Sequence, residues 1–103
     1  MENKVEHLTP YEVKKLARVY FKNKGRIINF QAVELKSGWV LILRIGQHES
    51  FDSHDVYISD PQGLIKTFLT FTELINVAIF ISDGVHFNMK VIPYSPFSAR
   101  DRA

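Results

Sequence analysis

Positive charge gathers near the N-terminus of the chain, and the residues that carry it have the type and spacing best suited to a chemical task. The first 26 residues hold seven lysines and arginines against three glutamates, a local balance of +4, whereas the whole chain carries +2. Six of these cations and one tyrosine form the candidate nucleic-acid-binding set: Tyr11, Lys14, Lys15, Arg18, Lys22, Lys24 and Arg26. Clustered cations can neutralise several phosphates of DNA, and a tyrosine beside them can stack on a base or form a hydrogen bond.

A second group of chemically capable side chains lies between residues 48 and 55. It contains two histidines and three carboxylates: His48, Glu49, Asp52, His54 and Asp55. Such side chains suit zinc or nickel, but their spacing in a loop fixes no ligand geometry, and polar residues normally collect in loops. We therefore predict no metal site.

Motifs of known catalytic machinery are missing from the sequence. There is no cysteine, no nucleophile elbow and no glycine-rich loop of the kind that holds nucleotide phosphates. We predict that the protein is not an enzyme and takes no cofactor. The opposite interpretation requires His54 and a carboxylate to converge in a pocket.

A predicted helix positions most of the cations. Thr9 fits the N-cap, Pro10 the first helical position, and Glu12 completes a capping box. Gly25 marks the end of the helix. Apolar residues recur with helical spacing at Val13, Leu16, Ala17 and Tyr20. The cations fall on a separate arc, so the helix is predicted to be amphipathic, and its basic face either contacts an anionic partner or is only solvated.

Strands are predicted after this helix. Alternating apolar residues slip in phase between Ala32 and Val33, which predicts a bulge or a strand that changes partners. Residues 36–38 and 60–63 have the composition of tight turns. The strands are expected at residues 28–35, 39–45, 56–58 and 64–69, with the run 39–45 in the centre of the sheet because it is apolar on both faces.

The last two elements complete the predicted fold. Thr70 and Glu73 form a second capping box that opens a helix through about Ile81, and an alternating strand follows over residues 85–91. The predicted class is α+β: an N-terminal amphipathic helix, an antiparallel β-meander of about four strands, one helix packed on the sheet, and a C-terminal strand. Residues 1–92 form a single domain in this prediction, and residues 93–103 form a flexible C-terminal tail.

Part of this pattern is shared with a known group of proteins. An apolar strand at residues 39–41, a turn at residues 60–63, Lys66 two residues before Phe68, a capped helix, and a closing strand from Gly84 occur in this order. In this outline, residues 39–91 resemble short accessory proteins encoded beside partition and maintenance genes of bacterial plasmids. The start of the helix at residues 71–73 departs from that pattern. The resemblance implies a bacterial mobile element and a binding role.

Composition supports a cytoplasmic binding protein. Hydrophobic residues make up 46% and charged residues 23%, as in globular domains, and no apolar run approaches the roughly 20 residues that span a bilayer. No signal peptide or membrane partner is predicted. We expect a small non-enzymatic accessory protein that binds nucleic acid, with the basic helix as the DNA-contacting face, or a protein partner. The alternative is a protein–protein interaction or oligomerisation module, such as a homodimer, without nucleic-acid binding.

Overall fold

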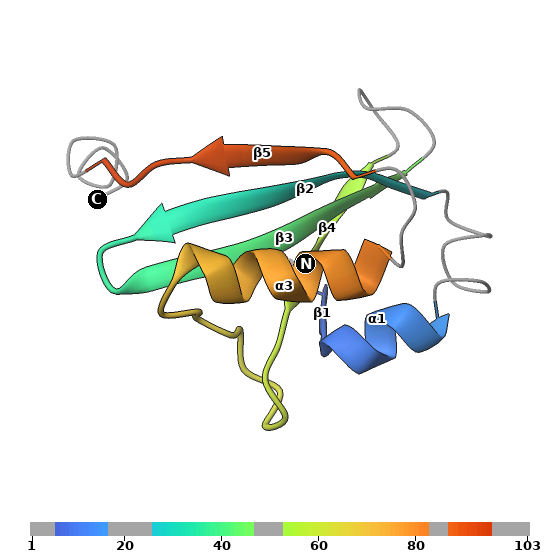
Figure 1. Ribbon diagram of the computed structural model, residues 1–103. Helices are drawn as coiled ribbons and strands as arrows, with labels where there is room; N and C mark the ends of the chain where they lie inside the picture. Colours follow the sequence, from blue (N-terminus) through green and yellow to red (C-terminus); the bar gives the residue numbers. More distant parts are fainter. Residues whose placement is uncertain (1–5, 17–25, 47–52, 83–86, 96–103) are drawn as a thin grey trace, which may run out of the picture.

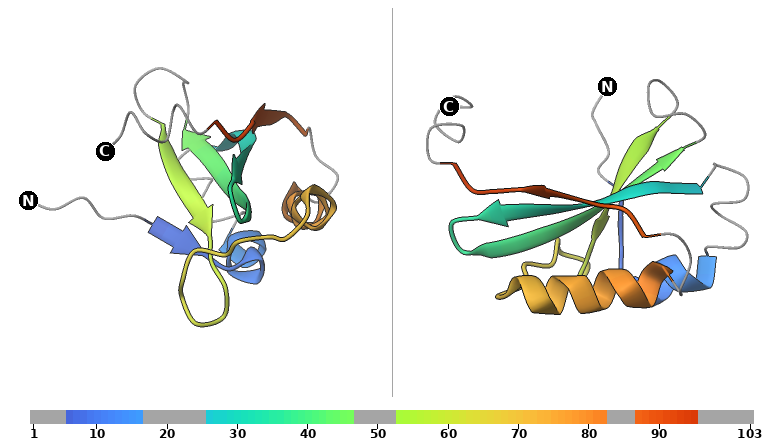
Figure 2. Two further views of the ribbon diagram at one scale, coloured as in Figure 1. Left: turned by 90° about the vertical axis from the view of Figure 1, so that its left-hand side faces the viewer. Right: turned by 45° about the horizontal axis from the view of Figure 1, so that its top comes forward.

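The computed structural model describes residues 6–16, 26–46, 53–82 and 87–95 (Figure 1). The elements in chain order are β1 (Glu6–Leu8), α1 (Pro10–Leu16), β2 (Arg26–Leu35), β3 (Gly38–Gly46), β4 (His54–Ile58), α3 (Phe71–Ser82) and β5 (Met89–Ile92). The strands form one sheet in the order β1-β4-β3-β2-β5. Both described helices lie against the same face of this sheet (Figure 2).

The predicted antiparallel meander is wrong, because the sheet is mixed. Strands β2, β3 and β4 are antiparallel neighbours, but β1 pairs parallel with β4, and β5 pairs parallel with β2. A helix lies in the connection from β1 to β2, and another in the connection from β4 to β5. Such helical crossovers bring the next strand back in the same direction, whereas short turns reverse it. The two parallel pairs therefore follow from where the helices stand in the chain.

Three details of the predicted strands are also corrected. The segment from Leu64 to Leu69 is not a strand: it makes only isolated bridges, at Ile65 and Phe68, and its two terminal leucines are exposed. The irregularity in β2 lies between Ile27 and Asn29, while residues 29–35 pair with β3 without interruption. Strand β1 was not predicted, and the last strand is shorter than expected, although it does lie at an edge of the sheet.

Both helices begin at the caps expected from the sequence, and the capping box is complete at α1, whereas at α3 Glu73 bonds to the residue before the cap. At α1, Thr9 Oγ1 accepts from the Glu12 N–H at 3.2 Å, and Glu12 Oε1 accepts from the Thr9 N–H at 2.9 Å. At α3, Thr70 Oγ1 accepts from the Glu73 N–H at 3.2 Å, and the Glu73 carboxylate accepts from the N–H of Leu69. The predicted helix 71–81 is confirmed, whereas residues 17–24 of the first predicted helix lie outside the described residues.

The hydrophobic core lies between the sheet and the two helices. From β3, Leu41, Leu43 and Ile45 are completely buried on this side. The core also contains residues from β2, β4, both helices and the segment before α3: Val13, Phe30, Ala32, Val56, Ile58, Phe68, Leu74, Ala78 and Ile81. Because each strand alternates its side chains, the residues between these ones point to the opposite face.

The opposite face of the sheet carries a mixture of polar and apolar side chains, and no described helix covers it. The register places Ile42 between Gln31 and Tyr57 in one row. In the next row, Arg44 Nε donates to Asp55 Oδ1 at 3.1 Å. We call this surface the open face.

A close backbone approach joins the β2–β3 hairpin to the segment before α3. The Trp39 N–H donates to the Phe68 carbonyl at 2.8 Å, and the Phe68 N–H donates to the Trp39 carbonyl at 2.7 Å. The neighbouring Gly38 has a φ of 154°, and a Cβ there would stand 2.4 Å from the Phe68 carbonyl oxygen. Glycine is therefore required at this position.

The predicted turn after β4 is confirmed. The Gly63 N–H donates to the Asp60 carbonyl at 2.9 Å, and the Asp60 carboxylate accepts from the N–H groups of Gln62 and Leu64. Aspartate is favoured at the first position of such turns for this reason. Neither helix that the structure describes is long and apolar enough to cross a membrane.

Candidate nucleic-acid interface

Two residues of the predicted nucleic-acid-binding set meet α3 at one aromatic ring. The rings of Tyr11 and Phe80 make an edge-to-face contact, with centroids 5.3 Å apart and planes at 66°. Lys14 Nζ lies 4.1 Å from the centroid of the same Phe80 ring. Residues three apart on a helix lie on the same side, so Tyr11 and Lys14 approach Phe80 together. The basic face predicted for α1 therefore borders α3. It does not lie entirely apart from the residues with which α1 packs on the rest of the protein.

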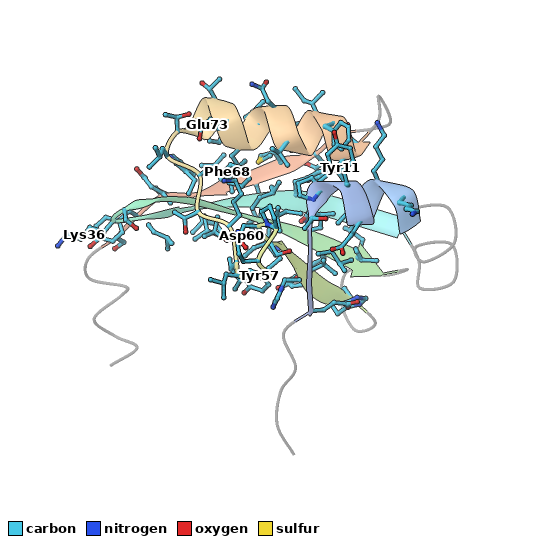
Figure 3. All side chains as sticks on the ribbon, turned by 90° about the horizontal axis from the view of Figure 1, so that it is seen from below. Tyr11, Lys36, Tyr57, Asp60, Phe68 and Glu73 are labelled. Carbon is cyan, nitrogen blue, oxygen red and sulfur yellow. The ribbon has the colours of Figure 1, made fainter. Side chains whose placement is uncertain are left out.

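The contact with Phe80 leaves most of Tyr11 accessible. Tyr11 is 77% exposed, and Figure 3 shows it between α1 and the neighbouring part of α3. Lys15, next to Lys14 along α1, is exposed. The α1–α3 surface, as we define it, consists of Tyr11, Lys14, Lys15 and Phe80. It combines aromatic area with two positive charges.

Arg26 stands at the same end of the molecule. It is the first residue of β2 and is exposed. The start of β2 and the C-terminal ends of α1 and α3 lie at one end of the fold (Figures 1 and 2). The other three cations of the predicted set, Arg18, Lys22 and Lys24, lie outside the described residues, so their share in a binding surface remains a prediction.

The carboxylates of Glu12 and Glu73 accept hydrogen bonds from backbone N–H groups at the starts of the two helices. Glu12 accepts from the Thr9 N–H in its capping box, and Glu73 accepts from the Leu69 N–H at the beginning of α3. Glu73 lies seven residues before Phe80, which corresponds to about 10 Å along a helix axis. The acidic group on α3 is therefore remote from the ring that Tyr11 and Lys14 contact.

Sequence reasoning missed Phe80 as part of this surface. The available signal was the apolar excess of residues 71–82, which leaves little polar surface for a helix with one buried stripe. A helix that is apolar beyond its core-facing stripe usually has a second neighbour. Here α1 is that neighbour, and its contact is an aromatic ring with a cation, which no periodicity reveals.

The metal-capable group of residues 48–55 is only partly described. Asp55 pairs with Arg44 on the open face, whereas His54 Nε2 lies 3.5 Å from Glu6 Oε1 on β1. The two residues are adjacent on β4, so their side chains point to opposite faces of the sheet. His48, Glu49 and Asp52 lie outside the described residues. Within the described ranges, no three histidine or carboxylate side chains come together as metal ligands would.

Comparison with known proteins gives no further evidence on the function of this site. The chain matches no family model, no curated protein and no solved structure. The candidate site therefore depends on geometry and charge alone.

Proposed function

We propose that the protein binds nucleic acid through the α1–α3 surface. The observation that carries this proposal is Tyr11, largely exposed beside Phe80, with Lys14 and Lys15 on the same helix. Lysines supply the charge that phosphates require, and exposed aromatic rings supply contacts to bases. Arg26 at the same end of the fold extends the positive charge from the helices to the sheet.

The biological setting follows the sequence interpretation. We place the protein in the cytoplasm as a non-enzymatic accessory protein of a bacterial mobile element, in line with the resemblance of residues 39–91 to plasmid-encoded accessory proteins. Binding without catalysis agrees with the side chains of the α1–α3 surface, which offer charge and ring area but no nucleophile paired with a base.

A titration of fluorescently labelled oligonucleotides tests the proposal. Anisotropy is recorded for the wild type and a Lys14→Ala/Lys15→Ala variant, at roughly 50 and 200 mM salt. We expect wild-type affinity to fall steeply as salt rises. The variant should bind more weakly at low salt, and its slope of log affinity against log salt should be smaller by about 1.4 to 1.8, as for two lost phosphate contacts.

A matched variant controls for the loss of two positive charges elsewhere. Lys36 in the β2–β3 turn and Lys90 on β5 are both exposed, and Figure 3 shows Lys36 at the far end of the molecule from Tyr11. Lys36→Ala/Lys90→Ala should bind as the wild type does. No binding at low salt, or equal weakening by both double variants, contradicts the proposal.

The outer edge of β5 favours a second candidate function, self-association through the sheet. The Phe30 N–H donates to the Asn88 carbonyl at 2.8 Å. Because alternate residues of an edge strand bond to its neighbour, the backbone groups of Met89 and Val91 point away from β2. The side chains of Val91 and Ile92 are exposed beside them. An edge of this kind can pair with a second copy of the chain.

Light scattering over a range of protein concentrations distinguishes this second function. A chain that associates through β5 should form a dimer, and Val91→Pro should return it to a monomer because proline removes an outward N–H without disturbing the bonds to β2. Nucleic-acid binding should be unchanged in this variant. A monomer at every concentration eliminates the second candidate.

A further inference from the structure

The accessible ring of Tyr11 distinguishes between two forms of nucleic acid. Tyr11 is 77% exposed, and its aromatic ring offers area that phosphate binding alone does not use. In a duplex the faces of the bases are stacked on one another, so an aromatic side chain on a protein surface cannot stack on them unless they are unpaired. The edge-to-face contact with Phe80 holds the Tyr11 ring against α3 while leaving it accessible.

Two cations lie on the same side of α1 as Tyr11, three and four residues further along the helix. Lys14 Nζ is held 4.1 Å from the centre of the Phe80 ring, within the range of a cation–π contact. Lys15 is exposed on the following position of α1. Aromatic rings interleaved with cations are the usual composition of surfaces that bind single strands without reading their sequence.

The packing of α1 argues against the alternative, in which the helix enters a duplex groove. The major groove is about 12 Å wide and admits one helix of about 10–12 Å diameter. Here α1 lies beside α3, joined to it through Tyr11, Lys14 and Phe80 (Figure 2). A helix that reads a groove does so with side chains that point away from the protein. Tyr11 and Lys14 are instead the residues through which α1 contacts Phe80.

From these three observations we propose that the α1–α3 surface binds single-stranded nucleic acid, with an unpaired base stacked on Tyr11 and adjacent phosphates at Lys14 and Lys15. This inference rests on the proposed function and specifies its ligand. Single-stranded binding also explains why an aromatic residue stands on the exposed side of α1, where a purely electrostatic surface would gain nothing from it.

The test compares three labelled probes on the full chain. They are a single strand, a duplex of the same sequence, and a single strand in which the bases are replaced by abasic sites. The wild type should bind the single strand at least about tenfold more tightly than the abasic strand, since one base–aromatic stack is worth about 5- to 150-fold. The duplex should resemble the abasic strand.

Substitutions at Tyr11 link this preference to one ring. Tyr11→Leu keeps an apolar contact with Phe80 but removes the aromatic face, and should lower single-strand affinity about 5- to 150-fold without changing duplex affinity. Tyr11→Phe should bind as the wild type does. Tyr94→Leu removes another exposed tyrosine, beyond β5, and should have no effect.

The two proposals fail in different ways. If Lys14→Ala/Lys15→Ala weakens binding but the three probes bind equally and Tyr11→Leu changes nothing, the protein binds phosphates and the single-strand inference is wrong. If Lys14→Ala/Lys15→Ala binds all probes as the wild type does, or if no probe binds, both the proposed function and this inference are wrong.

Discussion

The two faces of the sheet are built from the same strands, yet they bury their side chains by different means. On the helix-covered face, Leu41 and Leu43 of β3 are completely buried beneath α1 and α3. On the open face, Val40 and Ile42 of the same strand keep only 7% exposure, although no described helix lies over them. The register flanks Ile42 with two long side chains of the same layer, those of Tyr57 and Gln31.

This difference changes what can be inferred about a sheet from a strand whose sequence is apolar on both faces. Such a sequence often indicates a sheet covered by helices on both sides. In this protein it marks the middle of the sheet, where Ile42 lies between two long side chains of the neighbouring strands. Among the described residues, the register neighbours of Ile42 belong to its own layer, whereas the other face is covered by a second layer, the two helices.

The largest expected effect on stability comes from comparing one substitution on each face of the sheet. Leu43→Ala should lower the free energy of unfolding by about 2–5 kcal/mol, because a cavity remains between the sheet and the helices. Ile42→Ala removes as many carbon atoms but opens to solvent on one side, so we expect a loss at least about 1 kcal/mol smaller. Urea denaturation followed by the fluorescence of Trp39 measures both. Equal losses would show that the open face is covered in solution.

A second prediction concerns the end of the helix-covered face, where Gly38 meets the Phe68 carbonyl. Gly38→Ala places a Cβ against that oxygen in a backbone conformation that alanine rarely adopts. We expect a loss of about 1–3 kcal/mol. Gly63→Ala is the control, since it also has a positive φ, of 89°, but nothing lies within 4 Å of the added carbon. Stability loss no greater than in the control would mean that the close approach is not retained in solution.

A third and smaller effect tests the start of the helix that covers the core. Thr70→Ala removes the side-chain oxygen that accepts from the Glu73 N–H and should cost about 1 kcal/mol. Thr72→Ala, two residues into α3 and exposed, should cost much less. Thermal unfolding of the two variants supplies the comparison, and a cap that contributes nothing would leave them equal.

The smallest effect belongs to the open face. Asp55→Asn breaks the ion pair with Arg44, in which both side chains are about one-third exposed (37% and 34%). Exposed pairs of this kind contribute about 0–1 kcal/mol, and salt screens them. We expect a small loss of stability at low salt that disappears at high salt. A loss as large as that of Leu43→Ala would mean that Arg44 is left buried and unpaired.

The sequence predicts the local parts of this fold well. Caps at Thr9 and Thr70, the turn at Asp60 and the central strand β3 depend on residues close together in the chain, and each is confirmed. Local pattern cannot decide which strands pair. Segment 64–69 has the composition of a strand but finds no continuous partner, and β1, with 3 residues, is too short to show any periodicity.

The sequence likewise predicts only part of the candidate site. Tyr11, Lys14 and Lys15 follow from helical spacing around the capped start of α1. Their neighbour Phe80 does not, because it lies on a different helix some 65 residues later and is brought to α1 only by the helix-covered face of the sheet. Charge clustering indicates where to look, and tertiary packing decides which ring stands beside the charges.

The two parallel pairs at the sheet edges constrain how the chain folds while it is being synthesised. Strands β2, β3 and β4 follow one another and can assemble as hairpins soon after they leave the ribosome. Strand β1 emerges earlier but waits for β4, since Glu6 pairs with Val56, and β5 joins last, when Met89 meets Phe30. Such distant pairings slow folding. Both edge pairs can therefore form only after the three central strands have been synthesised.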